Sequence, residues 1–158
     1  MEIDIDLSAQ RLRLCDGGKQ VMDVAVSTGA NGIGEQNGSG CTPRGRHRVR
    51  AKIGQGAPPG AVFRGRRWTG EVWTPEAHDT QPGRDWILTR ILWLSGLEPG
   101  RNRLGPVDTF RRYIYLHGTP PVTALGTPGS KGCIRMNNAD IIRLFDLVAP
   151  GTEVNLHE

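Results

Sequence analysis

Apolar and polar residues alternate along the first part of the chain, which is the pattern of strands with one buried face. The alternation runs over residues 2–7 and again over 11–14, and a glycine turn at 16–18 separates the second run from a third at 21–27. Because short turns of this kind join antiparallel neighbours, the three runs are predicted to form a meander.

Further strand-like pieces follow, separated by loops rich in Gly and Pro. Strands are expected over 46–53, over 113–117, where two aromatic residues and a β-branched residue meet, and over 153–156. The apolar run at 86–94 is long enough for a fully buried strand. Residues 54–85 contain only short apolar pieces, and the pattern does not show whether they form a lid.

Only one stretch has a helical period. Apolar residues fall on one face at Ile141, Ile142, Phe145 and Val148. Asn137 or Asn138 can cap the start of this helix, and the Pro-Gly pair at 150–151 ends it. The chain is therefore predicted to be a single, mainly β domain over 1–158, with one clear α-helix at about 138–148.

Composition narrows the class of protein. The chain has 158 residues, a formal charge of +4, and 22 Gly with 11 Pro, which favours many short strands and turns over a helical bundle. No apolar run approaches the ~20 residues of a membrane-spanning helix. Most of the cations are arginines, and alternation predicts that Arg44, Arg46, Arg48 and Arg50 share one strand face. With aromatics at only 6%, no nucleic-acid partner is expected.

The residues with the clearest chemistry lie between 115 and 136. His117 ends a predicted strand, and Cys133 lies in a glycine-rich turn just before the predicted helix. A free thiol has a pKa of about 8.5, and the thiolate is the reactive form. An imidazole at His117 and the positive end of the helix are expected to favour the anion. This combination is typical of a cysteine nucleophile with a histidine base.

Other interpretations remain open at this point. Cys41, His47, His117 and Cys133 are a conceivable zinc set, although no short ligand pair such as Cys-x-x-Cys is present. The glycine-rich segment 28–40 lacks the Lys-Ser/Thr ending of a phosphate-binding loop and is interpreted as a flexible loop. A non-catalytic binding module is a further alternative.

The motif around these residues resembles the active-site signature of the L,D-transpeptidase catalytic (YkuD-type) domain family. The similarity lies in His117-Gly118-Thr119 and in Ser130-x-Gly132-Cys133-Ile134-Arg135-Met136, and it extends over about residues 2–156. It includes Val26-Ser27-Thr28-Gly29 and Thr42-Pro43-x-Gly45 in the first half. In the second half it includes WILTRILWLSGLEPG at 86–100, Arg112-Tyr113-Ile114-Tyr115 and Gly151-Thr152-x-Val154.

The resemblance implies a YkuD-like β-sandwich of mixed strands and a cysteine enzyme that acts on peptidoglycan stem peptides or muropeptides. Cys133 would be the nucleophile and His117 its general base, with no cofactor and no metal. Ser130, Gly132 and the Cys133 backbone would shape the oxyanion site.

The resemblance also implies a set of substrate contacts. Arg135 would hold a substrate carboxylate, and Tyr115 and Gly118 would flank the cleft. Many members of the family have His where this chain has Lys131, so a second imidazole is lost. Lys131 is then expected to attract an anionic group of the substrate.

The family reaction runs through a thioester on the cysteine after cleavage of the diaminopimelate–D-Ala bond. Water as acceptor gives an L,D-carboxypeptidase, and an amine acceptor gives an L,D-transpeptidase or amino-acid exchange. The odd cysteine count and the absence of a signal-peptide pattern predict a cytoplasmic protein if Met1 is native, and a periplasmic one if an export signal was trimmed. Water is therefore slightly favoured as acceptor. The resemblance further implies acylation of Cys133 by carbapenems.

Overall fold

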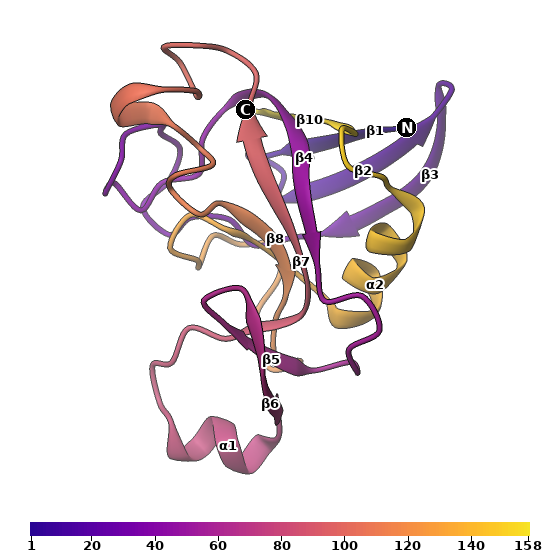
Figure 1. Ribbon diagram of the computed structural model, residues 1–158, viewed down its shortest axis with the longest axis vertical. Coiled ribbons are helices and arrows are strands. Elements are labelled where there is room, and N and C mark those ends of the chain that lie inside the picture. The colour runs from indigo at the N-terminus through magenta and orange to yellow at the C-terminus, as the bar shows by residue number, and fades with distance from the viewer.

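A computed structural model describes residues 1–158 as one curled, mixed sheet with a few short helices (Figure 1). The ten strands are β1 (Glu2–Asp6), β2 (Arg11–Asp16), β3 (Lys19–Ala25), β4 (Gly45–Ile53), β5 (Ala61–Arg64), β6 (Arg67–Val72), β7 (Ile87–Gly96), β8 (Tyr115–Gly118), β9 (Ile134–Met136) and β10 (Glu153–His157). The helices are α1 (Pro75–Thr80) and α2 (Asn138–Leu147), with a single 3₁₀ turn at Gly105–Val107.

Strand pairing follows the order β3-β2-β1-β10-β4-β7-β5-β6, and β8 and β9 branch from β7. β1 runs parallel to β10 and β8 runs parallel to β9, whereas the other neighbours are antiparallel. β7 is the centre of the sheet. It pairs with β4 and β5 along one edge and with β8 along the other. The predicted mainly β fold of mixed strands is therefore confirmed.

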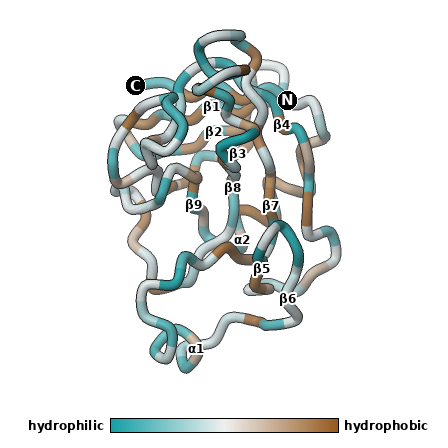
Figure 2. The backbone as a smooth tube through the Cα atoms, turned by 60° about the vertical axis from the view of Figure 1, so that its left-hand side comes forward, coloured by the Kyte–Doolittle hydropathy of each residue, from teal (hydrophilic) through white to brown (hydrophobic).

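The curl of the sheet encloses one large core. Apolar residues of β1, β2 and β3 meet those of β8, β9 and α2, and the set includes Ile5, Leu14, Leu116, Ile134 and Phe145, all essentially inaccessible to solvent. Burying side chains of this size supplies most of the driving force for folding. In Figure 2 apolar positions run along β7 and α2, whereas α1 is largely hydrophilic.

The predicted C-terminal helix is present, and its ends have clear causes. The side chain of Asn137 caps it by accepting a hydrogen bond from the amide of Ala139 at 2.8 Å, so Asn137 and not Asn138 is the cap. At the other end the ammonium of Lys52 donates to the carbonyls of Phe145 and Val148 at 2.6 and 2.7 Å. That contact satisfies carbonyls that the helix itself leaves free.

One local prediction, the strand start at 113, was wrong, and two other segments contain elements that the pattern had left open. The segment 54–85 contains the β5–β6 hairpin and α1, and β6 is exposed along its length, so it has no buried face for a pattern to reveal. β8 starts at Tyr115, because Tyr113 has a φ of +57° and cannot continue a strand. β9, between Cys133 and α2, was not anticipated because it has only three residues.

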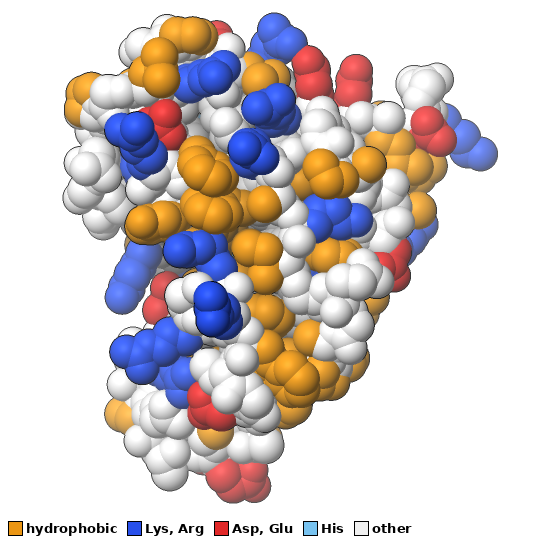
Figure 3. Space-filling model, viewed as in Figure 1, with side chains coloured by type: hydrophobic (Ala, Val, Ile, Leu, Met, Phe, Trp, Pro, Cys, Tyr) orange, Lys and Arg blue, Asp and Glu red, His pale blue; other side chains and the backbone are white.

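The arginines are not all placed as predicted. Arg44 precedes β4 and pairs with Glu35 and Glu158, while Arg46 pairs with Glu153. On the face shown in Figure 3, Lys and Arg side chains form small groups separated by apolar and uncharged atoms. No helix of the chain is both long and apolar enough to cross a lipid bilayer.

Candidate active site

The parallel pair β8–β9 brings Cys133 and His117 to the same face of the sheet. Leu116 is aligned with Ile134, and His117 with Arg135, so Cys133 lies level with Tyr115 at the start of β9. Leu116 and Ile134 point into the core. Because successive side chains point to opposite faces, His117 and Cys133 both point to the other face, as diagonal neighbours. This relation fits the predicted pairing of thiol and imidazole.

The imidazole of His117 has a defined orientation. It is buried, and its Nδ1 lies 2.6 Å from the carbonyl oxygen of Gly118. A carbonyl only accepts, so Nδ1 carries the proton and Nε2 is left as a proton acceptor. Burial lowers the pKa of His117, which keeps the ring neutral near pH 7. The ring is therefore in the form that a general base requires.

The thiol of Cys133 is a neutral group in this arrangement. Sγ donates to the carbonyl of Tyr113 and accepts from the amide of Tyr115, both at 3.3 Å, and no hydrogen bond joins it to His117. Burial raises the pKa of Cys133 to about 12, although the Tyr115 amide and nearby arginines oppose the rise. The expectation that the surroundings favour a resting thiolate is therefore wrong.

The position of α2 explains part of this difference. Cys133 directly precedes β9, and Asn137 caps α2 beyond the end of that strand. At about 3.3 Å per residue, the four residue steps from Cys133 to Asn137 separate the two residues by roughly 13 Å along the strand. Because the influence of a helix end fades within its first turn, α2 does not stabilise the anion.

Ser130 and Gly132 shape the turn that carries the thiol. The Ser130 hydroxyl accepts from the amide of Gly132 at 3.1 Å and donates to the carbonyl of Cys133. Gly132 has a φ of +121°, which only glycine adopts easily. With the Gly132 amide occupied, the amides of Lys131 and Cys133 are the two in this turn that make no hydrogen bond to a backbone or side-chain group. The Cys133 amide, next to the thiol, is thus free to face a developing oxyanion.

The glycine-rich segment 28–40 supports the turn that carries Cys133. The amides of Gly129 and Ser130 both donate to the carbonyl of Thr28, and Ala30 donates back to Ser130. The buried hydroxyl of Thr42 accepts from Gly29 at 2.8 Å and donates to the Gly132 carbonyl at 2.9 Å.

These contacts correct the interpretation of 28–40 as a flexible loop and leave its bonded amides unavailable for a phosphate. Sequence reasoning missed Thr42 as a supporting residue, and the Thr-Pro-x-Gly similarity was the signal that pointed to it.

A groove of about 280 Å³ opens beside the thiol, between the β5–β6 hairpin and the end of the β8–β9 pair. Its charged lining residues are Arg66, Arg112, Lys131 and Asp85. Tyr115 and Lys131 both line this groove. Their contact with a substrate stays a prediction.

Two other predicted contacts have different surroundings. The guanidinium of Arg135 pairs with Asp85 at 3.2 Å and donates to the carbonyl of Gly129 at 2.9 Å, so protein groups already occupy much of it. Gly118 is buried, and a Cβ there would lie 2.7 Å from the carbonyl oxygen of Leu88. Gly118 therefore permits close packing behind His117 and does not line the groove.

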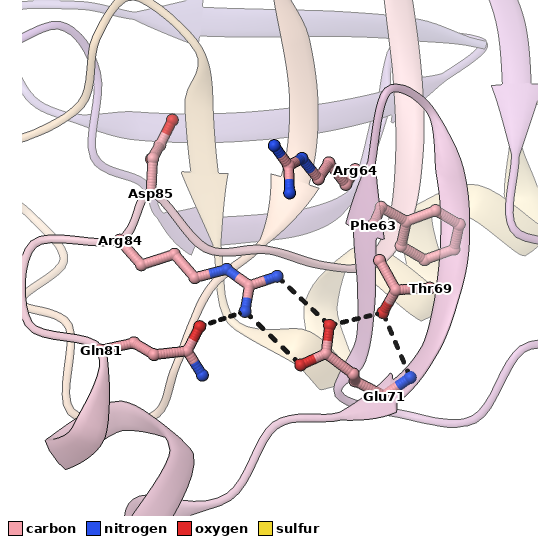
Figure 4. Close-up of a pocket in the computed structure, with 7 residues that line it drawn as sticks. All are labelled: Phe63, Arg64, Thr69, Glu71, Gln81, Arg84 and Asp85. Atoms are coloured by element: carbon pink, nitrogen blue, oxygen red, sulfur yellow. Dashed lines mark hydrogen bonds and ion pairs between the residues drawn. The ribbon is translucent and has the colours of Figure 1, made fainter.

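A second, polar pocket of about 660 Å³ adjoins the groove and shares Asp85 and Phe63 with it. Figure 4 shows Arg84 reaching across this pocket to Gln81 and to Glu71, while the Asp85 carboxylate points away from that network. Asp85 instead pairs with Arg135, and it also lines the groove beside the thiol.

The residues considered as a zinc set do not converge. No group of three or more His, Cys, Asp or Glu side chains is placed to hold a metal ion. His47 is buried, and both of its ring nitrogens are engaged, one by the Gly45 carbonyl at 3.0 Å and one by the Thr109 hydroxyl at 2.8 Å. His47, a residue of β4, is therefore a buried structural side chain.

A buried imidazole and a cysteine on a strongly held turn thus lie on one face of a curled β-sheet, with a groove beside the thiol. The model of the L,D-transpeptidase catalytic domain (YkuD) matches residues 1–156, and the chain belongs to that family.

Curated relatives match over shorter segments. The Bacillus subtilis protein YkuD, which is named as an L,D-transpeptidase, is 37% identical over 62 residues, covering 36% of this chain and 38% of YkuD. The Escherichia coli protein YcfS, also named as an L,D-transpeptidase, is 49% identical over 41 residues, covering 26% of this chain and 13% of YcfS. The matched segments thus span less than half of either relative.

Solved structures share the fold along the whole chain. The L,D-transpeptidase of Enterococcus faecium superposes with a TM-score of 0.60 at 17% identity, covering 99% of this chain and 49% of that one. L,D-transpeptidase 3 of Mycobacterium tuberculosis, solved with a faropenem-derived adduct, gives 0.58 at 16% identity, covering 99% and 59%. At these identities the comparison establishes the fold.

Proposed function

We propose that the chain catalyses acyl transfer on peptidoglycan tetrapeptide stems, through a thioester on Cys133. The observation that carries this proposal is the tautomer of His117. Its Nδ1–H is fixed on Gly118, so Nε2 accepts a proton on the sheet face that also carries the thiol. Membership of the L,D-transpeptidase catalytic domain family supports the choice of reaction and substrate.

In the first step His117 acts as base and then as acid. The thiol leaves its hydrogen bond to Tyr113 and transfers its proton to Nε2 of His117, while Sγ attacks the carbonyl carbon of diaminopimelate. The Cys133 amide faces the developing oxyanion. The C–N bond to D-Ala breaks, the proton on Nε2 passes to the leaving amine, and the thioester remains. Because thiol and imidazole both start neutral, proton transfer accompanies attack and does not precede it.

We propose water as the acceptor that resolves the thioester. The groove carries three cationic side chains, Arg66, Arg112 and Lys131, against the single carboxylate of Asp85, which is already paired with Arg135. This balance attracts the carboxylates of a stem peptide and repels an acceptor that arrives as an ammonium ion. An amine acceptor, which gives cross-linking or amino-acid exchange, is the alternative outcome of the test.

The test incubates the protein with a free tetrapeptide, alone and with an added D-amino acid, and identifies the products by mass spectrometry. We expect release of D-Ala and a tripeptide that remains the main product when the amine is present. Exchange of D-Ala for the added amino acid as the main product would contradict the hydrolytic proposal. Inertness toward the tetrapeptide under both conditions would contradict the substrate.

Variants separate the chemistry from the fold. Cys133→Ala is expected to abolish release, whereas Cys41→Ala, which alters another partly exposed cysteine, is the matched control and is expected to retain it. His117→Ala is expected to slow release by about 10²–10⁴, the usual contribution of a general base. Imipenem is expected to add one drug mass to the wild type and none to Cys133→Ala, and turnover by Cys133→Ala would refute the thioester.

A further inference from the structure

Arg66 occupies the tip of the β5–β6 hairpin, directly over the groove that contains Cys133. It lines that groove together with Tyr115, Lys131 and the thiol. No carboxylate of the protein pairs with it, and its only hydrogen bond runs from Nη1 to the Tyr115 hydroxyl at 3.2 Å. A guanidinium has five N–H donors, so most of the donors of Arg66 have no partner within the protein.

Two aromatic rings hold this guanidinium from one side. The Cζ atom of Arg66 lies 4.9 Å from the ring centroid of Trp93 and 4.9 Å from that of Tyr113. The two centroids are only 6.0 Å apart, whereas rings on opposite faces would be separated by nearly twice either contact distance. The rings therefore form a corner, and the remaining side of the guanidinium is open. Cation–π contacts of this kind orient a charge without using its hydrogen-bond donors.

The other cations of the site are less available for a ligand. Arg135 is committed to Asp85 and to the Gly129 carbonyl. Arg112 is half-buried and donates to the carbonyl of Cys41 at 2.6 Å and to that of Gly34 at 3.3 Å. Lys131 is exposed, and a mobile, hydrated ammonium does not offer the fork that a carboxylate accepts.

Backbone conformation sets where the two contacting side chains start. Arg66 has a φ of +62° and Tyr113 a φ of +57°, and neither residue is glycine. At Arg66 the positive φ belongs to the two-residue turn that this residue forms with Gly65 (φ +55°) between Arg64 and Arg67. At Tyr113 the surrounding structure holds a conformation that is unfavourable for ordinary side chains. The hairpin turn and Tyr113 meet in one contact, and that contact directs the guanidinium at the groove.

We propose that Arg66 is the residue that binds the substrate carboxylate beside Cys133, the role that the family resemblance implies for Arg135. This inference deepens the proposed function and rests on it for the identity of the substrate. The hairpin tip thus supplies specificity for an acyl donor that carries a carboxylate, and Trp93 and Tyr113 are its positioning residues.

The test uses two alkylating probes that differ in charge and hardly in size. Iodoacetate and iodoacetamide both react with the thiolate, forming a C–S bond and releasing iodide, and peptide mapping reports the product at Cys133. The ratio of the alkylation rate with iodoacetate to that with iodoacetamide at pH 9 measures how strongly the site attracts a carboxylate. Changes in thiol ionisation or in access affect both probes and cancel in the ratio.

Arg66→Gln is expected to lower this ratio by at least about tenfold, the lower limit for a hydrogen bond between charged groups. Arg66→Lys is expected to recover only part of it, because a point charge does not replace the fork. Arg67→Gln is the matched control, since that neighbouring arginine is exposed and does not line this groove. A ratio unchanged in Arg66→Gln, or lowered equally in Arg67→Gln or more strongly in Lys131→Gln, would overturn the proposal.

A substrate experiment keeps this inference separate from the proposed function. Arg66→Gln is expected to raise KM for the tetrapeptide at least about tenfold, with a much smaller effect on a tetrapeptide whose carboxylates are amidated. If the wild type does not turn over the tetrapeptide, the proposed function fails while the probe ratio still tests Arg66. If turnover is normal and the ratio is insensitive to Arg66, only the carboxylate-binding role fails.

Discussion

The pH dependence of Cys133 alkylation provides the sharpest check on how the nucleophile is activated. With a pKa of about 12, the ionised fraction of Cys133 at pH 7 is about 10⁻⁵. A cysteine with the ordinary pKa of about 8.5 is a few per cent ionised under the same conditions, so the thiolate population of Cys133 is lower by more than about a thousandfold.

A more basic thiolate is intrinsically more nucleophilic, which offsets part of this difference. For a Brønsted coefficient of about 0.4–0.5, a rise of roughly 3.5 pKa units increases the reactivity of the anion by about 30–50-fold. The expected net result is alkylation of Cys133 at pH 7 that is slower than that of a reference cysteine peptide by about 10²-fold. The rate should then increase about tenfold per pH unit up to pH 10.

The assay follows iodoacetamide incorporation at Cys133 by peptide mapping between pH 7 and 10, with the reference peptide in the same tube. His117→Ala, measured in parallel, is expected to leave the profile unchanged, because no hydrogen bond joins the imidazole to the resting thiol. A plateau below pH 8 that disappears in His117→Ala would demonstrate a preformed thiolate–imidazolium pair and refute the reasoning.

Two further predictions concern supporting contacts. Thr42→Val removes a buried hydroxyl and leaves the Gly132 carbonyl and its other partner unpaired. It is expected to lower the free energy of unfolding by about 2–4 kcal/mol in urea titrations. Thr80→Val, at an exposed position, is the control. An equally small loss of unfolding free energy in both variants would contradict a supporting role for the Thr42 hydroxyl. Asp4 raises the pKa of His157, so the pair stabilises the fold below about pH 6.5 and the stabilisation fades as pH rises through the raised pKa. The decrease in Tm from pH 6 to 8 should therefore be smaller in Asp4→Asn, and an identical decrease would exclude the contact as its cause.

Regular alternation was enough to predict the outer strands and α2. The first meander and the helix over 138–147 have continuous buried faces, such as Ile3 and Ile5 in β1, and a burial period is visible in any sequence that has one. β6 and α1 bury almost nothing and show no such period. The strand start at Tyr115 depends on a positive φ at Tyr113 that no residue type announces.

The candidate site was predictable where the motif names residues and unpredictable where it depends on the environment. Cys133 and His117 do share a sheet face, as strand–loop–helix topology suggested. The charge state of the thiol could not be foreseen, because it is set by burial and by a β9 strand that separates it from α2. The corner that holds Arg66 combines residues of three separate segments, and their meeting is a property of the folded chain alone.

The contact between Thr42 and Gly132 spans 90 positions of sequence. The turn that carries Cys133 is thus assembled by partners that come together only when distant parts of the sheet have closed, and such long-range contacts form slowly. A partly folded chain lacks the assembled turn around Cys133. The slow, native-like alkylation of Cys133 should therefore return only in the final kinetic phase of refolding.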